Sequence, residues 1–255
     1  MAGGQTLMAP APRDIQIRAL ASQQDFRDAV DLQQSIWGFD DVDLLPVRLF
    51  VVATKIGGQA FGAFHEGRMV AFCLSIPGLK AGGQYYLHSH MLGVAADYRN
   101  DGIGRRLKLQ QREEAVGRGL DLMEWTFDPL ELKNAYFNIE RLGAVIRRYV
   151  RNQYGQTSSQ LHGGLPTDRC TAEWWLRTER VVQAVAGQSF AKPGIEARLA
   201  VPADIDHIRS REPRRAREIQ AALSDGFEEL FSQNLTVVGF EKSRDAGTYC
   251  FGRLA

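Results

Sequence analysis

Hydrophobic and polar residues follow two different periods in the first third of the chain, and the changes of period predict a series of strands and helices. Residues 15–20 alternate between apolar and polar, which is typical of a half-buried strand. Ser22 then opens an amphipathic pattern with the period of a capped helix. Residues 46–56 are interpreted as a second helix because a proline suits the first turn, although their β-branched run favours a strand. Two apolar runs on either side of Glu66 and Gly67 predict a hairpin.

The middle of the chain has the order strand, glycine-rich turn, helix, strand. An apolar strand pattern covers residues 82–94, the helix pattern ends at Gly117 or Gly119, and residues 120–127 have a second strand pattern. This order predicts that the two strands are parallel neighbours. A short helix that ends at Gly143 follows them.

The rest of the chain predicts more strands and one strong helix. Strand patterns lie in residues 145–155 and 169–178, and the loop of residues 156–168 between them is long enough to form a lid or a flap. Residues 183–194 have the composition of a linker. A helix and two strands then close the chain. The apolar face of that helix consists of Ile219, Leu223, Phe227, Leu230 and Phe231.

These elements predict an α/β fold with a mixed sheet of the α+β kind. We expect residues 1–13 to be a disordered leader and residues 14–187 to form the main domain. We expect residues 188–255 to form a C-terminal β-α-β extension that packs on the same sheet.

Composition and charge narrow the classes of partner. With 255 residues and 44% hydrophobic content, the chain can bury a large core. The 31 Lys and Arg against 30 Asp and Glu leave a net charge of +1, so no overall field favours nucleic acid or an anionic membrane. We therefore expect neither as a partner, and any anion site must be local. Composition and charge do not decide between a monomer and a homodimer.

The cysteines and the start of the chain bear on the compartment. Cys73, Cys170 and Cys250 lie far apart without C-x-x-C spacing, which is typical of reduced, buried thiols. The leader has no apolar core of the kind that signal peptides carry, and no apolar run has the length of a membrane span. We therefore expect the protein to be cytoplasmic.

The most specific signal is the run VAADYRNDGIGRRL, residues 94–107. A strand that enters a helix through a glycine-rich turn offers unpaired backbone N–H groups and the positive end of the helix dipole, which together bind phosphate. Gly102 and Gly104 allow a positive φ and a close approach to a ligand. Leu107 stands where a dinucleotide motif needs a small residue, and no G-K-[S/T] of a P-loop is present. On spacing alone, a purely structural glycine turn with solvated arginines is the alternative interpretation.

The same run resembles the acyl-CoA-binding motif of the GNAT superfamily of N-acyltransferases. It has an apolar strand end at Val94, five residues to Arg99 and then x-x-G-x-G. The words TFDPL, NAYFN, LGA and GLPTDR also resemble a subgroup of predicted acetyltransferases whose acceptor is unassigned. The resemblance covers residues 15–155 and implies the GNAT fold, with acetyl-CoA or another acyl-CoA as co-substrate and no metal.

The resemblance also implies which residues hold the coenzyme. The strand end would contact the pantetheine arm, and the backbone amides of the turn would hold the pyrophosphate. The residues given this role are Leu92, Val94, Arg99, Asn100, Asp101, Gly102, Ile103, Gly104, Arg105 and Asn134.

Acylation of an amine needs a neutral amine, a donor for the developing oxyanion and a proton for the departing thiolate. His88 stands six residues before Val94, where histone-acetylating relatives carry a glutamate base. By the two-residue period of a strand, His90 shares a face with His88, Leu92 and Val94. His90 can therefore orient His88 as a base. The simpler alternative is that the two histidines only form hydrogen bonds within the sheet. Glu124 is a further candidate base, with a salt bridge to an arginine as its plainer alternative.

The proton donor is where the chain departs from the family. Ile139 occupies the position at which many members have a tyrosine, and Tyr136 and Tyr149 are the nearest substitutes. Asn134 is the nearest substitute for an asparagine at the helix start, because Leu132 occupies that spacing. Either these substitutes serve, or the thiolate leaves without a protein acid.

Together these features predict an acyl-CoA-dependent N-acyltransferase (EC 2.3.1.-). Its default donor is acetyl-CoA, and its acceptor is a small-molecule amine, for example an amino acid, which attacks directly. Arg147, Arg148 and Arg169 are candidates for binding an acceptor carboxylate. The alternative is a catalytically weak acyl-CoA-binding or sensing module of the same fold, which lacks the acid at Ile139.

Overall fold

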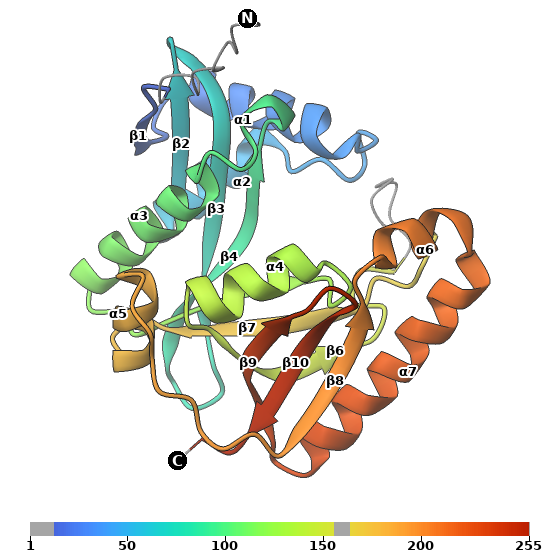
Figure 1. Ribbon diagram of the computed structural model, residues 1–255. Helices are drawn as coiled ribbons and strands as arrows, with labels where there is room; N and C mark the ends of the chain where they lie inside the picture. Colours follow the sequence, from blue (N-terminus) through green and yellow to red (C-terminus); the bar gives the residue numbers. More distant parts are fainter. Residues whose placement is uncertain (1–12, 156–163, 255) are drawn as a thin grey trace, which may run out of the picture.

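The computed structural model describes residues 13–155 and 164–254, and its strands form one sheet of ten strands (Figure 1). The strands are β1 (Gln16–Ala19), β2 (Gln59–His65), β3 (Arg68–Leu79), β4 (Tyr85–Val94), β5 (Leu122–Phe127), β6 (Val145–Val150), β7 (Arg169–Trp175), β8 (Ala197–Pro202), β9 (Thr236–Lys242) and β10 (Ala246–Gly252). The helices are α1 (Gln23–Trp37), α2 (Val47–Lys55), α3 (Ile103–Gly117), α4 (Leu132–Tyr136), α5 (Glu179–Val185), α6 (Ile205–Arg211) and α7 (Pro213–Ser232), with a 3₁₀ turn η1 (Ala96–Tyr98) and a π-helical turn η2 (Phe137–Arg141).

The strand order is β1-β2-β3-β4-β5-β7-β6-β9-β10-β8. Every neighbouring pair is antiparallel except β4 and β5, which confirms the predicted parallel pair. That parallel pairing is short, because only Leu87 with Met123 and His88 with Glu124 are in register. Both strands continue past these residues, β4 to Val94 and β5 to Phe127, so they part toward their carboxyl ends.

A β-bulge interrupts the pairing of β4 with β3. Leu74 pairs with Met91 and the next residue, Ser75, pairs with Ser89, which leaves His90 as the extra residue of β4. Because side chains alternate between the faces of a strand, one extra residue changes the face on which all later side chains lie.

The two faces of the sheet carry different helices (Figure 1). On one face, α1 and α2 pack on β2 and β3 through a cluster that includes Phe26, Phe50 and Phe72. On the other face, Ile103 and Leu107 of α3 pack on the same strands. The short α4 and η2, with α5 and α7, cover this second face over the remaining strands.

Local sequence signals account for several boundaries. Ser22 and Asp25 form a capping box at the start of α1, which confirms the predicted cap. Glu66 (φ 50°) and Gly67 (φ 77°) adopt the left-handed backbone of a type I′ turn, which confirms the hairpin. The predicted second helix is present as α2, Val47–Lys55, with Pro46 as its N-cap. Its apolar side chains pack on the sheet, and this burial outweighs their β-branched preference.

The C-terminal part extends the sheet with β8, β9 and β10. It joins the preceding strands through Ile146 and Val237, the one residue pair in register between β6 and β9. Phe227 of α7 is fully buried, and its ring centroid lies 5.0 Å from those of Tyr149 and Tyr249. The predicted single helix between strands is in fact two, α6 and α7, because Pro213 begins a second helix after the first ends. Residues 183–185 of the predicted linker belong to α5.

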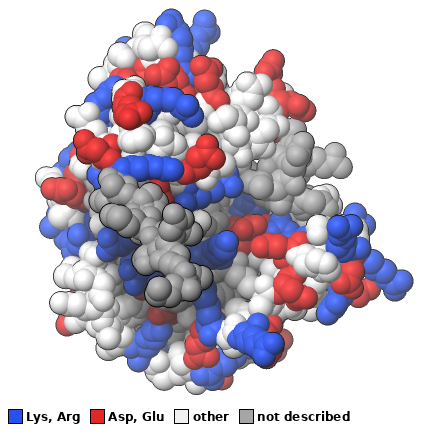
Figure 2. Space-filling view, turned by 45° about the horizontal axis from the view of Figure 1, so that its top comes forward, with Lys and Arg blue, Asp and Glu red and all other residues white. Residues whose placement is uncertain are grey.

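The cysteines are buried and free, as predicted. Most of the predicted leader, residues 1–12, and the centre of the predicted lid, residues 156–163, lie outside the described residues. Within the described ranges, no helix is long and apolar enough to cross a membrane. The face shown in Figure 2 carries basic and acidic side chains interspersed, in keeping with a net charge of +1.

Candidate active site

The 3₁₀ turn η1 and the glycine turn connect the end of β4 at Val94 to the amino end of α3 at Ile103. Gly102 precedes the helix with φ +75°, a left-handed conformation that a glycine adopts without strain. No side chain among the described residues caps this helix end. The first-turn N–H groups and the positive end of the helix dipole therefore face outward together, as an anion such as a pyrophosphate requires.

Gly104 brings the helix close to the strand end. A Cβ atom at this position would lie 3.5 Å from Leu92 Cδ2 and 3.8 Å from Val94 Cγ2. Leu92 and Val94 pack against the core formed by Ile103 and Leu107, so the turn and the strand end form one continuous surface. Ile103 is itself buried and offers a ligand only its backbone N–H.

The arginines around the turn point in different directions. The guanidinium of Arg105 donates to the carbonyl of Val185, and Arg106 Nη2 donates to the carbonyl of Ile15 at 2.6 Å. These two guanidinium groups therefore fasten α3 to the end of α5 and to the residue before β1. Only the backbone N–H of Arg105 is left for the predicted contact with the coenzyme. Arg99 is exposed beside the turn.

A cation that sequence reasoning missed lies at the same turn. Arg13 Nη1 lies 3.2 Å from Asp101 Oδ2 and donates to the carbonyl of Asp97 at 2.6 Å. The guanidinium stacks 4.3 Å from the ring centroid of Tyr98. Nothing local to Arg13 indicates this, since only the folding of the chain brings residues 13 and 101 together.

A row of polar side chains crosses the sheet on the opposite side from α3. His88, Glu124 and Glu173 are register neighbours on β4, β5 and β7, and neighbours in register share a face. His88 also pairs with Ile76, which packs on the core under α1 and α2. The row therefore lies on the face that carries α1 and α2.

Three cations surround the two buried carboxylates of this row. Arg148 Nη2 lies 2.7 Å and Lys80 Nζ 2.5 Å from Glu124 Oε1, and Arg147 Nη1 lies 3.4 Å from Glu173 Oε2. The alternative of a salt bridge for Glu124 is thus the arrangement that the structure has. The side chains of Arg147 and Arg148 are 44% and 49% exposed, so part of each guanidinium faces solvent.

The two histidines lie next to each other in a partly buried setting. Their ring centroids are 5.8 Å apart. Burial lowers the pKa of His88 to about 4, with His90 as the next cause, and burial also lowers the pKa of His90. Both rings are therefore neutral at pH 7, the form that accepts a proton. The prediction that both share a face with Leu92 and Val94 is wrong, because the bulge at His90 moves the later residues to the α3 side.

Comparison with known proteins identifies the family. Residues 26–143 match the sequence model of the Acetyltransferase (GNAT) family. This part of the chain belongs to the GNAT family. No protein of curated function matches the sequence. Among solved structures, the ribosomal-protein-S18-alanine N-acetyltransferase from Escherichia coli covers 65% of this chain and 96% of its own, with 18% identity and a TM-score of 0.51. NAA60 from Arabidopsis thaliana, in complex with a bisubstrate analogue, covers 64% of this chain and 98% of its own, with 14% identity and a TM-score of 0.52.

The GNAT fold places the predicted acid candidates away from the histidines. Ile139 is fully buried in η2. Tyr136 packs on the core of the α3 side, and the Lys242 ammonium lies 3.9 Å above its ring. Tyr149 donates to Asp168 Oδ2 at 2.7 Å, and burial raises its pKa far above the usual range. Tyr149 therefore forms part of the contact between β6 and α7. Asn134 is exposed on α4.

Helix α3 carries a buried lysine that the sequence analysis did not identify. Lys108 of α3 is 4% exposed, although a lysine on an amphipathic helix usually lies on the solvent side. Its position on the same helix face as Leu107, Gln111 and Ala115 was the available signal.

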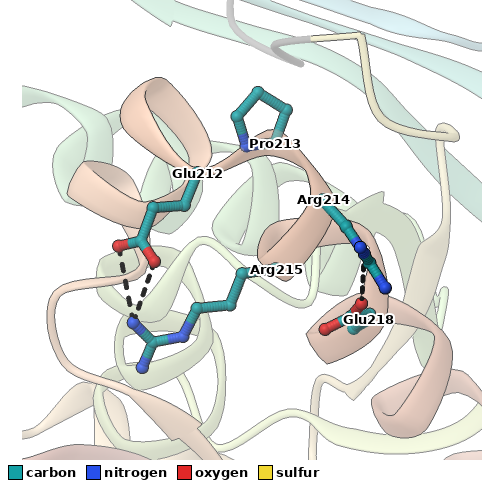
Figure 3. A pocket seen from close by; sticks show the side chains of 5 residues that line it. All are labelled: Glu212, Pro213, Arg214, Arg215 and Glu218. Carbon is teal, nitrogen blue, oxygen red and sulfur yellow. Dashed lines mark hydrogen bonds and ion pairs between the residues drawn. The ribbon is translucent and has the colours of Figure 1, made fainter.

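A separate surface pocket lies where α6 meets α7 (Figure 3). Its charged side chains pair with one another: Glu212 Oε2 lies 3.2 Å from Arg215 Nη1, and Glu218 Oε1 lies 3.0 Å from Arg214 Nε. Because these exposed charges already pair with one another, they offer few free donors or acceptors to a ligand. Among the described residues, no group of three or more His, Cys, Asp or Glu side chains is placed to hold a metal ion.

Proposed function

We propose that this GNAT protein is an acyl-CoA-dependent N-acyltransferase with acetyl-CoA as its default donor and a small amine as its acceptor. The observation that carries the proposal is the uncapped amino end of α3, which follows β4 in the chain after that strand has parted from β5. A thioester arm that enters between the strands would have its phosphates at the turn and its acyl group beside the β4 bulge.

The residues of the turn and the strand end fit the coenzyme. The backbone N–H groups of Gly102, Ile103, Gly104 and Arg105 would hold the pyrophosphate, with Arg99 as a nearby cation. When bound, the coenzyme supplies a thioester, which is the activated acyl group. Backbone N–H groups of β4 between Leu92 and Val94 would donate to the acyl oxygen as it gains charge.

The polar face beyond His88 supports a carboxylate-bearing amine as the acceptor. Lys80, Arg147 and Arg148 outnumber the carboxylates of Glu124 and Glu173 by one charge. The half-exposed guanidinium groups retain donors for a bidentate contact with an acceptor carboxylate. The amine of an amino acid bound this way would lie on the face of His88, and an acceptor with several positive charges would be repelled.

Two measurements test the proposal in sequence. Calorimetric titration with coenzyme A is expected to show binding, and thiol release from acetyl-CoA is expected with amino acids more than with the corresponding amides. Binding without thiol release on any amine would support the alternative of a sensing module, because Ile139 cannot supply a proton to the thiolate. Absence of coenzyme binding would contradict both functions.

His88→Ala is expected to lower kcat at pH 7 by about 10²-fold, the usual contribution of a general base. Because the pKa of His88 is about 4, the native ring stays neutral above pH 5 and its own titration does not limit the rate near neutrality. Raising the pH should narrow the difference in kcat between the variant and the native protein, since more of the acceptor amine is then already neutral.

The matched control is His207→Ala, which removes an exposed histidine of α6. Its kcat and its pH profile should equal those of the native protein. If the profile of the His88 variant runs parallel to the native one across pH 6–9, His88 is not the base.

We also propose a cytoplasmic compartment and a small-molecule acceptor. Three buried, unpaired thiols support a reducing compartment such as the cytoplasm. The interspersed surface charges support a small-molecule acceptor over nucleic acid or an anionic membrane (Figure 2).

A further inference from the structure

Lys108 is a buried ammonium group without a carboxylate partner among the described residues. Its Nζ donates to Ser89 Oγ at 2.7 Å and lies 3.7 Å from the centroid of the Trp125 ring. The other buried residues of α3 are Ile103, Leu107, Gln111 and Ala115, none of which carries a charge. Burying a charge without an ion pair costs free energy that a leucine or methionine would not cost, so packing alone does not account for a lysine here.

The position of Lys108 in the sheet is specific. Ser89 follows His88, the last β4 residue that pairs with β5, and Trp125 follows its partner Glu124. The ammonium therefore bridges β4 and β5 one residue beyond their last pair, where the strands begin to part. Under the proposed function, this is the end of the cleft that receives the thioester.

The surroundings of Lys108 contain an unused hydrogen-bond donor. Ser89 Oγ donates to Gln111 Oε1 at 3.1 Å, and Gln59 donates to the carbonyl of Gln111 at 2.9 Å. Gln111 Nε2 is buried and has no hydrogen-bond partner among the described residues. A ligand group that reaches this end of the cleft would therefore meet a free amide donor beside the ammonium group.

We propose that Lys108 donates a proton to the sulfur of coenzyme A as it departs, in place of the tyrosine that Ile139 replaces. This inference rests on the proposed function. The acceptor nitrogen forms a bond to the acyl carbon, the carbon–sulfur bond breaks, and its electron pair stays on sulfur. The sulfur then takes a proton from Lys108 Nζ. The nitrogen loses one proton to His88 or water, and water reprotonates Lys108 after the products leave. An amine and a thioester thus give an amide and a thiol.

The acidity of Lys108 suits this role. Burial lowers its pKa to about 7, which makes it a stronger acid than a free lysine and a match for an alkyl thiolate. Cys73 of β3 faces it as a neutral thiol, since burial raises that pKa to about 12. His88 of β4 is neutral above pH 5, and Glu124 of β5 lies on the other face of the sheet.

The other charged groups of α3 near Lys108 are engaged elsewhere. Arg112 donates to the carbonyl of Leu176 at 2.8 Å, and Glu114 pairs with Arg118 at 2.9 Å. Lys108 is therefore the group at the cleft end that changes charge near neutral pH.

Lys108→Met tests the proposal, because methionine fills the same apolar space without a proton. With acetyl-CoA its kcat should fall about tenfold or more. The native kcat is expected to decline above pH 7 as Lys108 loses its proton, and the variant should lack this decline. With an aryl thioester whose thiol is already acidic, the loss should be less than about twofold, because that sulfur needs no proton. Equal losses with both donors would overturn the proposal and indicate a structural role.

A second measurement does not depend on turnover. The thiolate absorbance of bound coenzyme A, followed against pH, reports the pKa of its thiol. A nearby ammonium should hold that pKa lower in the native protein than in Lys108→Met, and equal values would overturn the proposal. Lys108→Leu is the second variant should the methionine protein not fold, and Lys133→Met of α4, an exposed lysine, is the control. A native protein that neither binds coenzyme nor releases thiol would instead contradict the proposed function itself.

Discussion

Gly104→Val is expected to lower the affinity for coenzyme A by about tenfold or more, which corresponds to about 1.4 kcal/mol of binding free energy. The native Gly104 leaves room for a Cβ at ordinary contact distance from Leu92 and Val94. The helix therefore accepts a side chain without a clash, but two further methyl groups would occupy the surface where the pantetheine arm meets the turn. Isothermal titration measures the effect.

A control at the other end of the same helix separates binding from folding. Gly117→Val changes a glycine of α3 whose added Cβ would meet nothing within 4 Å. This variant should bind coenzyme A as the native protein does, and both should unfold at similar temperatures. Undiminished affinity in Gly104→Val would contradict the assignment of the turn as the phosphate site. Gly102 is the poorer test, because its φ of +75° would strain any β-branched residue.

Lys108→Met is expected to raise the free energy of unfolding at pH 7 by about 4 kcal/mol at most, since it removes a buried charge. The pKa of Lys108 is about 7 in the folded chain against a usual 10.5, so the unfolded chain binds more protons between these values. Stability from this group therefore rises as pH increases from 7 to about 10.5 and is lost again as pH falls. Methionine should abolish that rise.

Denaturant unfolding at pH 6, 7, 8 and 9 measures the free energy of unfolding of the native protein and of Lys108→Met. The difference between the two values at each pH removes the contribution of the other titrating groups, which both proteins share. Lys133→Met, at an exposed site on α4, should change stability by less than about 0.5 kcal/mol at every pH. A constant difference between native and Lys108→Met across this range would show that Lys108 does not titrate there. A stabilised but less active variant is the usual outcome when a strained group is kept for function.

Sequence reasoning succeeded where short-range chemistry decides the structure. The capping box at Ser22, the turn at Glu66 and Gly67, and the glycine turn before α3 each depend on residues within a few positions of one another. The parallel pairing of β4 with β5 followed from the order of elements alone.

It failed where distant parts of the chain decide the outcome. The bulge at His90 depends on the register with β3, so no pattern within β4 shows that Leu92 and Val94 lie on the other face from His88. Arg105 matches a phosphate cradle in sequence, but the carbonyl of Val185, 80 residues away, takes its guanidinium. Residues 179–185 pack Val181 into the core and form a helix despite the linker composition that follows them.

The sequence by itself determined the family, the order of most elements and the turn that would hold the coenzyme, because those depend on local spacing. Only the tertiary structure decided the chemistry around them. It aligned His88, Glu124 and Glu173 across three strands and placed three cations around the two carboxylates. It also buried Lys108 where β4 and β5 part. The physical reason is that charge, burial and hydrogen-bond partners depend on what lies nearby in space, whereas a sequence shows only what lies nearby along the chain.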